Sequence, residues 1–330
     1  MKNELHTLQI VRGVAAMMVV TNHLLGGAFP TLWGSFFRSN GGFGVDIFFV
    51  LSGFLMVYTQ HEGKGPWLFL KGRIVRIYPL YILLSTPLIL MYVPINNYFT
   101  LFGNFLLLPG FNMPNYHLAN HPSWTLVYEM VFYVLFSISL LVSRKKTCSA
   151  IIVVLFIIAV LVITRIIGQQ PRVGSVNAGY MLGDKLMLNF AAGCILALMH
   201  NRLKNVNLIP FWFFSLIVIS IFIVVFNFIK AERIFLFGVP AMLIIAVASV
   251  TQNSDSFIFK LLHKIGDASY IIYLFHIYFA LALQQSVRAN YGNIEAVQLI
   301  AITCVVLAIV SGVFLNKTLE KPILQYYKNK

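Results

Sequence analysis

The sequence comprises 330 residues, of which 59% are hydrophobic and only 10% are charged, and its mean hydropathy is +0.83. Soluble globular chains are about a quarter charged, so this composition excludes a soluble domain. Apolar runs of about 20 residues, separated by short polar breaks, predict an all-α polytopic membrane protein, because such runs are too long for barrel strands. We assign the net charge of +14 to basic cytoplasmic loops rather than to a nucleic-acid partner.

The apolar runs predict about ten transmembrane helices in a single integral domain, 1–330, with a core of about 5–317 and a short cytoplasmic tail, 318–330. The stretch 98–110 is apolar but short and ends in Pro-Gly, which favours a re-entrant or interfacial helix. The predicted spans lie near 8–28, 42–60, 77–95, 124–143, 149–167, 184–200, 208–229, 233–251, 268–289 and 296–316.

The distribution of Lys and Arg predicts the orientation. The loops on the same side as the N-terminus carry most of these residues, so we expect both termini in the cytoplasm. We also expect the first run to be a retained span rather than a cleaved signal peptide, since it is long and has little preceding charge. Three single cysteines, Cys148, Cys194 and Cys304, have neither metal-site spacing nor a disulfide pattern.

The first predicted span carries Arg12 and His23 within an otherwise apolar sequence. Eleven residues make about three helical turns, so both side chains lie on one face, ~16 Å apart along the axis. A charge near the bilayer centre costs at least ~2.5 kcal/mol, and such residues normally face a protein interior or a wet cavity. We therefore interpret this helix as one wall of an intramembrane active site.

Two carboxylates, Asp46 and Glu129, lie early in inward-running spans, and His23 lies late in an outward-running one. The three are expected in the outer half of the bilayer at similar depth, where a carboxylate can orient an imidazole that acts as a general base. The alternative is a structural polar cluster that joins helices. His276 is expected nearer the bilayer middle, and for this residue a hydrogen-bonded core histidine is the stronger alternative.

A basic cluster precedes the third predicted span. Arg73 and Arg76 are three residues apart and so are neighbours on a helix face, followed by Tyr78. Paired guanidinium groups bind phosphate oxygens well. The same pattern also suits an anchor on anionic lipid headgroups.

Other polar residues have two readings. Ser52, beside Gly53, is either a nucleophile or part of a small-residue packing face, and packing is the commoner use.

By position, four residues are candidates to stabilise an oxyanion: Asn22, Tyr78, Trp124 and Tyr273.

Together these residues resemble the motifs of the membrane acyltransferase type 3 family. The order and spacing of the matches along the chain make the resemblance specific, although each is weak alone. The matches are Arg12 and His23; Gly44 to Phe54; Arg73 to Pro79; Ser123-Trp124 with Glu129; Tyr273 with His276; and Glu320-Lys321-Pro322.

The resemblance implies transfer of an acyl group, usually acetyl, from cytoplasmic acetyl-CoA to a hydroxyl of a carbohydrate or glycolipid acceptor, such as O-antigen, at the bacterial inner membrane. It implies no metal, and the chain resembles the stand-alone form of the family. The expected catalytic residues are His23, Asp46 and Glu129; the expected donor-binding residues are Arg12, Arg73, Arg76 and Tyr78; the expected acceptor-binding residues are Trp124, Ser52, Tyr273 and His276.

We expect direct transfer, in which His23 removes the acceptor proton while Asp46 or Glu129 orients the imidazole. An acyl-enzyme on His23 or Ser52 remains open. The main alternative function is a secondary transporter or flippase that uses the buried charges as a proton relay. A structural partner in an envelope complex is a third reading.

Overall fold

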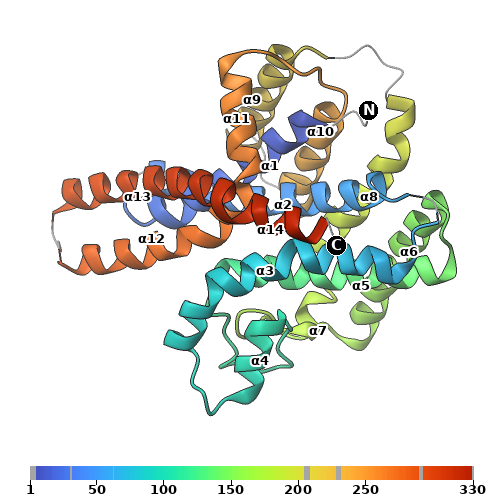
Figure 1. Ribbon diagram of the computed structural model, residues 1–330, viewed down its shortest axis with the longest axis horizontal. Coiled ribbons are helices and arrows are strands. Elements are labelled where there is room, and N and C mark those ends of the chain that lie inside the picture. Colours follow the sequence, from blue (N-terminus) through green and yellow to red (C-terminus); the bar gives the residue numbers. More distant parts are fainter. Residues whose placement is uncertain are drawn as a thin grey trace. The chain divides into compact units, whose positions relative to one another are not determined.

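The computed structural model describes residues 5–29, 32–61, 63–203, 209–227, 232–289 and 293–328. These residues form helices and loops, and the β-pairing found among them is limited to isolated bridges (Figure 1). The helices are α1 His6–Leu25, α2 Leu32–Tyr58, α3 Pro66–Tyr92, α4 Tyr98–Leu106, η1 His121–Ser123, α5 Trp124–Val142, α6 Lys146–Ile167, α7 Ala178–Met181, α8 Leu186–Leu203, α9 Phe211–Asn227, η2 Ile234–Gly238, α10 Val239–Ala248, α11 Phe257–Asp267, α12 Ser269–Ala289, α13 Ile294–Leu315, η3 Asn316–Glu320 and α14 Lys321–Lys328.

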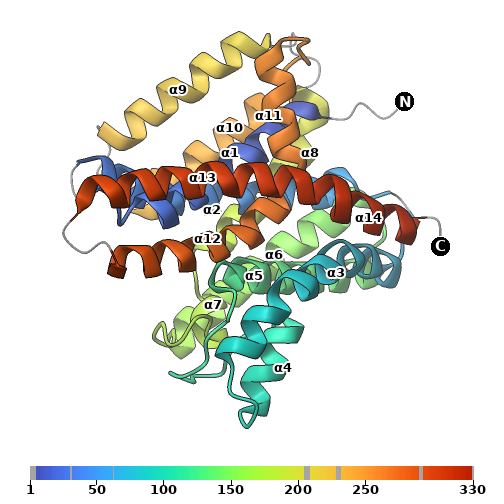
Figure 2. The same ribbon diagram turned by 60° about the vertical axis from the view of Figure 1, so that its left-hand side comes forward.

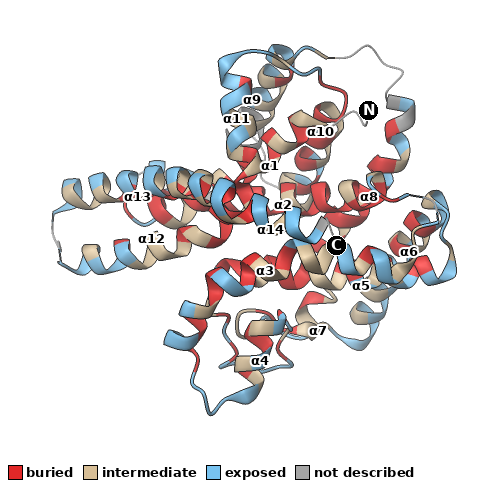
Figure 3. Cartoon of the chain, viewed as in Figure 1, coloured by how far each residue is buried: buried red, intermediate tan, exposed pale blue. Residues whose placement is uncertain are grey.

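Within the described ranges, seven helices are long and apolar enough to cross a membrane, and three shorter apolar helices accompany them. Many of their apolar side chains are exposed, especially along α6 and α13 (Figure 3). Apolar surface on this scale is unusual for a soluble monomer and suits contact with lipid. The prediction of an all-helical, multi-pass membrane protein is confirmed.

The contacts divide the chain into two compact units. The first contains residues 1–51 and 199–322, and the second contains residues 52–198 and 323–330. The helix α2 contributes to both. Each unit has its own buried residues and is described separately below.

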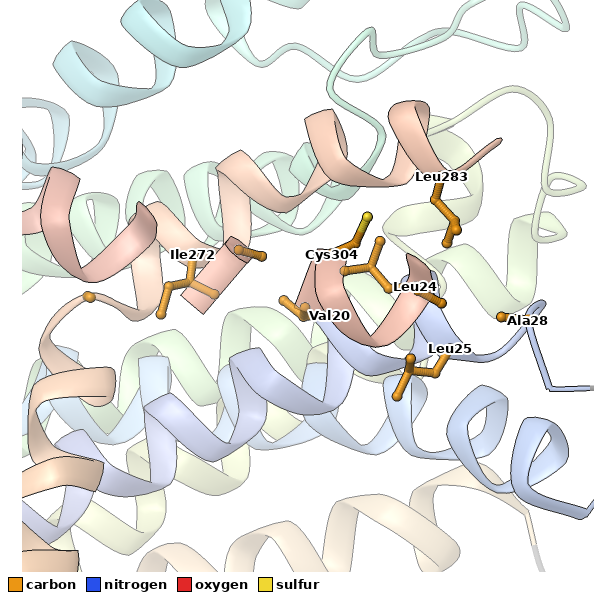
Figure 4. Packing of buried hydrophobic residues seen from close by; sticks show 10 residues of the cluster. Val20, Leu24, Leu25, Ala28, Ile272, Leu283 and Cys304 are labelled. Carbon is orange, nitrogen blue, oxygen red and sulfur yellow. The ribbon is translucent and has the colours of Figure 1, made fainter. Parts of the chain in front are cut away.

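In the first unit, α1 packs against α10, α11, α12 and α13. The last two run side by side in opposite directions, as both ribbon views show (Figure 2). A cluster of buried apolar side chains packs α1 against both of them (Figure 4). It includes Val20, Leu24, Leu25, Ala28, Ile272, Leu283 and Cys304.

Close approach of α1 and α11 depends on two glycines. A Cβ atom on Gly13 would lie 2.8 Å from the backbone nitrogen of Gly266, and a Cβ on Gly266 would collide with the carbonyl of Gln9. Small residues at such crossings let helix backbones touch in membrane proteins. This contact brings the start of α1 against the end of α11.

In the second unit, α5 packs against α3 and α6, and α4 packs against α3. A second glycine contact joins α2 to α8, because a Cβ on Gly53 would collide with the carbonyl of Phe190. The absence of a side chain at Gly53 thus permits close packing of these two helices. The short α4 is too short to span a bilayer, as expected for the stretch 98–110.

Several predicted boundaries differ from the structure. The helix α3 begins at Pro66 rather than near residue 77, so Arg73 and Arg76 lie within it. Proline suits the first helical turn, and Pro79 and Pro87 do not end this helix. Internal prolines are tolerated in transmembrane helices, where neighbouring groups satisfy the freed backbone carbonyls.

None of the predicted spans covers α11. Charged residues interrupt its apolar pattern, and Ser256 caps it by accepting a hydrogen bond from the N–H of Phe259. An amphipathic helix of this kind lacks the continuous apolar run that predicts a span. The predicted tail 318–330 is helical as far as Lys328, because α13 continues through η3 into α14.

Candidate active site

His23, in α1, and His276, in α12, are hydrogen-bonded to each other. The Nδ1 atom of His23 lies 2.8 Å from the Nε2 atom of His276, and the rings stack with an interplanar angle of 15°. His276 is fully buried at 0% exposure, whereas His23 is partly exposed. A bond between two ring nitrogens needs one hydrogen and one lone pair, so the pair shares a single proton in this contact.

Arg12, also in α1, holds the junction between α11 and α12. Its Nε donates to the hydroxyl of Ser269 at 2.6 Å, and its Nη2 donates to the carbonyl of Gly266 at 3.1 Å. The glycine contact between α1 and α11 brings this carbonyl within reach. A positive charge beside the carbonyl end of α11 also complements the helix dipole. Arg12 therefore has a structural use, besides its predicted role in donor binding.

Asp46, in α2, is fully buried and pairs with Arg233. The Nε and Nη2 atoms of Arg233 donate to Oδ2 of Asp46 at 3.2 and 2.8 Å. Nη2 also donates to the carbonyl of Gly42 at 3.2 Å. The arginine side chain is 45% exposed, while that of Asp46 is 1% exposed. A buried carboxylate requires such a partner, since an unpaired one is costly to desolvate.

The aromatic ring of Tyr273 lies near the histidine pair within the first unit. Tyr273 is buried and lies edge-on to Phe48 with ring centroids 5.5 Å apart. Its ring centroid lies 6.1 Å from that of His276. The side chain of Asn22 packs against Gly41. Two of the proposed oxyanion stabilisers, Tyr273 and Asn22, thus lie in the same unit as His23.

In the second unit, Glu129 accepts two side-chain hydrogen bonds. The hydroxyl of Ser52 donates to its Oε1 at 2.8 Å, and the phenol of Tyr133 donates to the same oxygen at 3.1 Å. Ser52 and Tyr133 are buried. Tyr133 follows Glu129 by four residues and therefore lies on the same face of α5.

Arg73 lies over two neighbouring aromatic rings, whose centroids are 6.3 Å apart. Its Cζ is 5.4 Å from the ring centroid of Phe69 and 5.5 Å from that of Tyr133. Its Nη2 donates to the hydroxyl of Thr59 at 3.1 Å. Arg76 is exposed. The aromatic faces hold the Arg73 guanidinium in a fixed orientation, and its neighbour is accessible to a ligand.

Tyr78 and Trp124 complete the predicted set. The hydroxyl of Tyr78 donates to the carbonyl of Leu106 at 2.7 Å and so ties α3 to the end of α4. Trp124 lies edge-on to Tyr128 with ring centroids 5.5 Å apart. Tyr128 in turn donates to Oδ2 of Asp184 at 2.8 Å. These contacts fix the start of α5, where Trp124 is partly exposed.

Each predicted catalytic residue has a polar partner within its own unit: His23 has His276, Asp46 has Arg233, and Glu129 has Ser52 and Tyr133. Sequence reasoning selected neither Arg233 nor Tyr133 as a site residue. Arg233 could have been recognised as a basic residue at the start of an apolar run, and Tyr133 by its four-residue spacing from Glu129. In the part of the chain that the structure describes, no group of three or more His, Cys, Asp or Glu residues is suited to hold a metal ion.

Comparison with known proteins identifies the family. The model of an acyltransferase domain, type 3, matches residues 5–327. The chain belongs to the type 3 acyltransferase family. Over 80 residues this acyltransferase is 38% identical to "Protein 2 in picA locus" of Rhizobium radiobacter, a match that covers 22% of this chain and 38% of that protein. No solved structure matches the acyltransferase.

The resemblance drawn from the motifs is thus confirmed at the level of the family. The family model places this chain in a family of acyltransferases. The long apolar helices make the acyltransferase a multi-pass membrane protein.

Proposed function

We propose that this acyltransferase moves an acetyl group from cytoplasmic acetyl-CoA to a hydroxyl of a cell-surface carbohydrate or glycolipid at the bacterial inner membrane. The observation that carries the proposal is the combination of a hydrogen bond and partial exposure at His23. One ring nitrogen is hydrogen-bonded to a buried partner, while the side chain remains partly exposed. An imidazole held in this way suits a general base, because it is oriented and still accessible to a substrate.

The proposed topology has ten spans and both termini in the cytoplasm. Seven long helices and three shorter apolar ones supply that number within the described residues. The excess of basic residues in the predicted inner loops supports the orientation. In this arrangement the whole chain serves as one membrane domain, with donor and acceptor approaching from opposite sides.

The donor is proposed to bind through Arg73 and Arg76. Guanidinium groups suit the phosphates of coenzyme A. Aromatic support of Arg73 and exposure of Arg76 agree with this role. Tyr78, in the same unit, and Arg12, in the other, are also proposed to contribute to donor binding.

The proposed chemistry is direct acyl transfer. His23 accepts the proton of the acceptor hydroxyl while the hydroxyl oxygen attacks the thioester carbonyl carbon. The C–S bond then breaks, and the proton passes from the imidazolium to the sulfur, which leaves as the coenzyme A thiol. Asp46 and Glu129 remain members of the proposed catalytic set.

The test uses purified protein in lipid vesicles with radiolabelled acetyl-CoA and surface polysaccharide extracted from cells that lack the gene. We expect acetyl transfer by the wild type and a fall in kcat of about 100-fold or more in His23→Ala. His263→Ala is the matched control, because His263 forms another histidine pair. Its Nε2 lies 2.8 Å from the Nδ1 of His6. Transport of a substrate without acetyl turnover would instead identify a transporter.

A further inference from the structure

The histidine pair can exist in two tautomeric arrangements, and only one leaves His23 able to act as a base. If Nδ1 of His23 carries the shared hydrogen, its Nε2 keeps a lone pair and can accept a proton. If Nε2 of His276 carries the hydrogen, Nε2 of His23 carries one as well and cannot accept another. The chemistry therefore depends on which ring donates in the 2.8 Å contact.

The surroundings of His276 favour the first arrangement. Its Nδ1 is buried and has no hydrogen-bond partner of good geometry among the described residues. The backbone groups of Ile272 and Tyr273, one turn earlier in α12, interact with this ring. The N–H of Ile272 is bonded to the carbonyl of Ala268, and Tyr273 lies inside α12, where its N–H is used by the helical bond to residue 269. The groups that remain to meet Nδ1 are therefore carbonyl acceptors. A hydrogen on Nδ1 satisfies them, and Nε2 then keeps the lone pair that accepts from His23.

Burial separates the roles of the two rings. His276 is fully buried, so a substrate cannot reach it without movement of the surrounding side chains. His23 is partly exposed and can meet one. The alternative is a purely structural role, in which the pair only stabilises the packing of α1 against α12. The apolar cluster of Val20, Leu24 and Ile272 already packs these two helices together. The helix contact therefore does not depend on the imidazoles alone.

We propose that His276 is a positioning residue that fixes His23 as the Nδ1–H tautomer and stabilises its protonated form during acyl transfer. This inference rests on the proposed function, in which His23 is the base, and it replaces the expectation that His276 binds the acceptor. His276 takes the place that a carboxylate occupies behind the histidine in many hydrolases. Nε2 of His276 accepts the Nδ1 hydrogen of His23 throughout the reaction, and the proton taken from the acceptor resides on Nε2 of His23 until the thiol leaves.

The kinetic test compares His276→Ala and His276→Gln in the vesicle assay. We expect His276→Ala to lower kcat about 10- to 100-fold with an unchanged KM for acetyl-CoA. His276→Gln keeps an acceptor oxygen on a side chain of similar reach, and it should recover most of kcat. Ile272→Ala serves as a packing control, since it weakens the same helix contact and leaves the pair intact. Equal losses in His276→Ala and His276→Gln, matched by Ile272→Ala, would overturn the positioning role.

A spectroscopic test does not require turnover. With ¹⁵N-labelled histidine in nanodiscs, and His23→Ala used to assign the signals, we expect His23 to carry its hydrogen on Nδ1 in the wild type. In His276→Ala it should shift toward the Nε2–H form, and in His263→Ala it should not change. A wild-type His23 in the Nε2–H form would refute the inference. Absence of acetyl transfer by a wild type that shows the Nδ1–H form would refute the proposed function and leave the tautomer assignment standing.

Discussion

Buried charges in this acyltransferase are matched by specific partners. Asp46 lies in an apolar span, and its Oδ2 accepts two N–H groups from Arg233. The arginine reaches the carboxylate from the first residues of another apolar segment and keeps part of its side chain exposed. The pair is therefore a buried carboxylate that holds a partly exposed cation. Removal of the arginine and removal of the carboxylate are expected to change the free energy of unfolding by different amounts.

Arg233→Ala is expected to destabilise the protein by about 3 kcal/mol, because it removes the guanidinium that pairs with the buried Asp46 carboxylate. The free energy of unfolding is measured by SDS titration in mixed micelles. Adding Asp46→Asn to this variant should restore much of the loss. Lys260→Ala is the matched control, since its ion pair with Asp255 is exposed, and it should have no measurable effect. Equal effects of the two single variants would show that burial of Asp46 does not govern the pair.

The contacts of Arg73 give a kinetic prediction that separates the ring of Tyr133 from its hydroxyl. Arg73→Ala should raise the KM for acetyl-CoA about 10-fold or more, through loss of a charge-assisted contact to phosphate. Tyr133→Leu removes one of the two supporting rings and should raise the KM about fivefold. Tyr133→Phe keeps the ring and loses only the bond to Glu129, so the KM should stay unchanged. A rise in Tyr133→Phe equal to that in Tyr133→Leu would assign the effect to the hydroxyl.

At the scale of helices, the sequence predicted positions along an element better than partners between elements. The shared face of Arg12 and His23 follows from helical periodicity alone, and α1 is a continuous helix across both. The partner of His23 is 253 residues away in the chain, and periodicity holds no information about such a contact. Likewise α3 was predicted to start too late, because its basic residues were interpreted as a loop, and α11 was missed because charged residues interrupt its apolar run.

Packing of α1 against α11 gives a prediction at the same scale. Gly13→Ala places a Cβ 2.8 Å from the nitrogen and 2.9 Å from the Cα of Gly266, and backbone atoms cannot yield without a shift of one helix. We expect a destabilisation of about 2 kcal/mol, typical of overpacked contacts. Gly27→Ala is the matched control, since a Cβ there meets nothing within 4 Å. A Gly13→Ala protein as stable as Gly27→Ala in the same SDS titration would show that the two helices are free to separate.

For the whole molecule, the proposed function requires a defined orientation, because coenzyme A is cytoplasmic and the proposed acceptor lies on the opposite side. The apolar composition and the long helices establish a multi-pass protein. The side on which each loop lies comes from the distribution of Lys and Arg alone. The native cysteines provide a means to read this orientation, since Cys148 is exposed and Cys194 and Cys304 are buried.

Cys148 lies in the first turn of α6, two residues after the basic run Arg144, Lys145 and Lys146, and the proposed topology puts this turn in the cytoplasm. A membrane-impermeant maleimide should therefore label the protein in inside-out vesicles and leave it unlabelled in intact cells. A permeant maleimide should label it in both, and Cys148→Ser should abolish both signals. Four predicted spans precede this cysteine, so it reports the same side as the N-terminus.

Labelling in intact cells would place Cys148 on the outer side. An epitope on the N-terminus would then separate an inverted protein, with the epitope also outside, from an odd number of spans before Cys148, with the epitope still inside. Either result would place the α6 turn on the acceptor side and exclude the proposed topology.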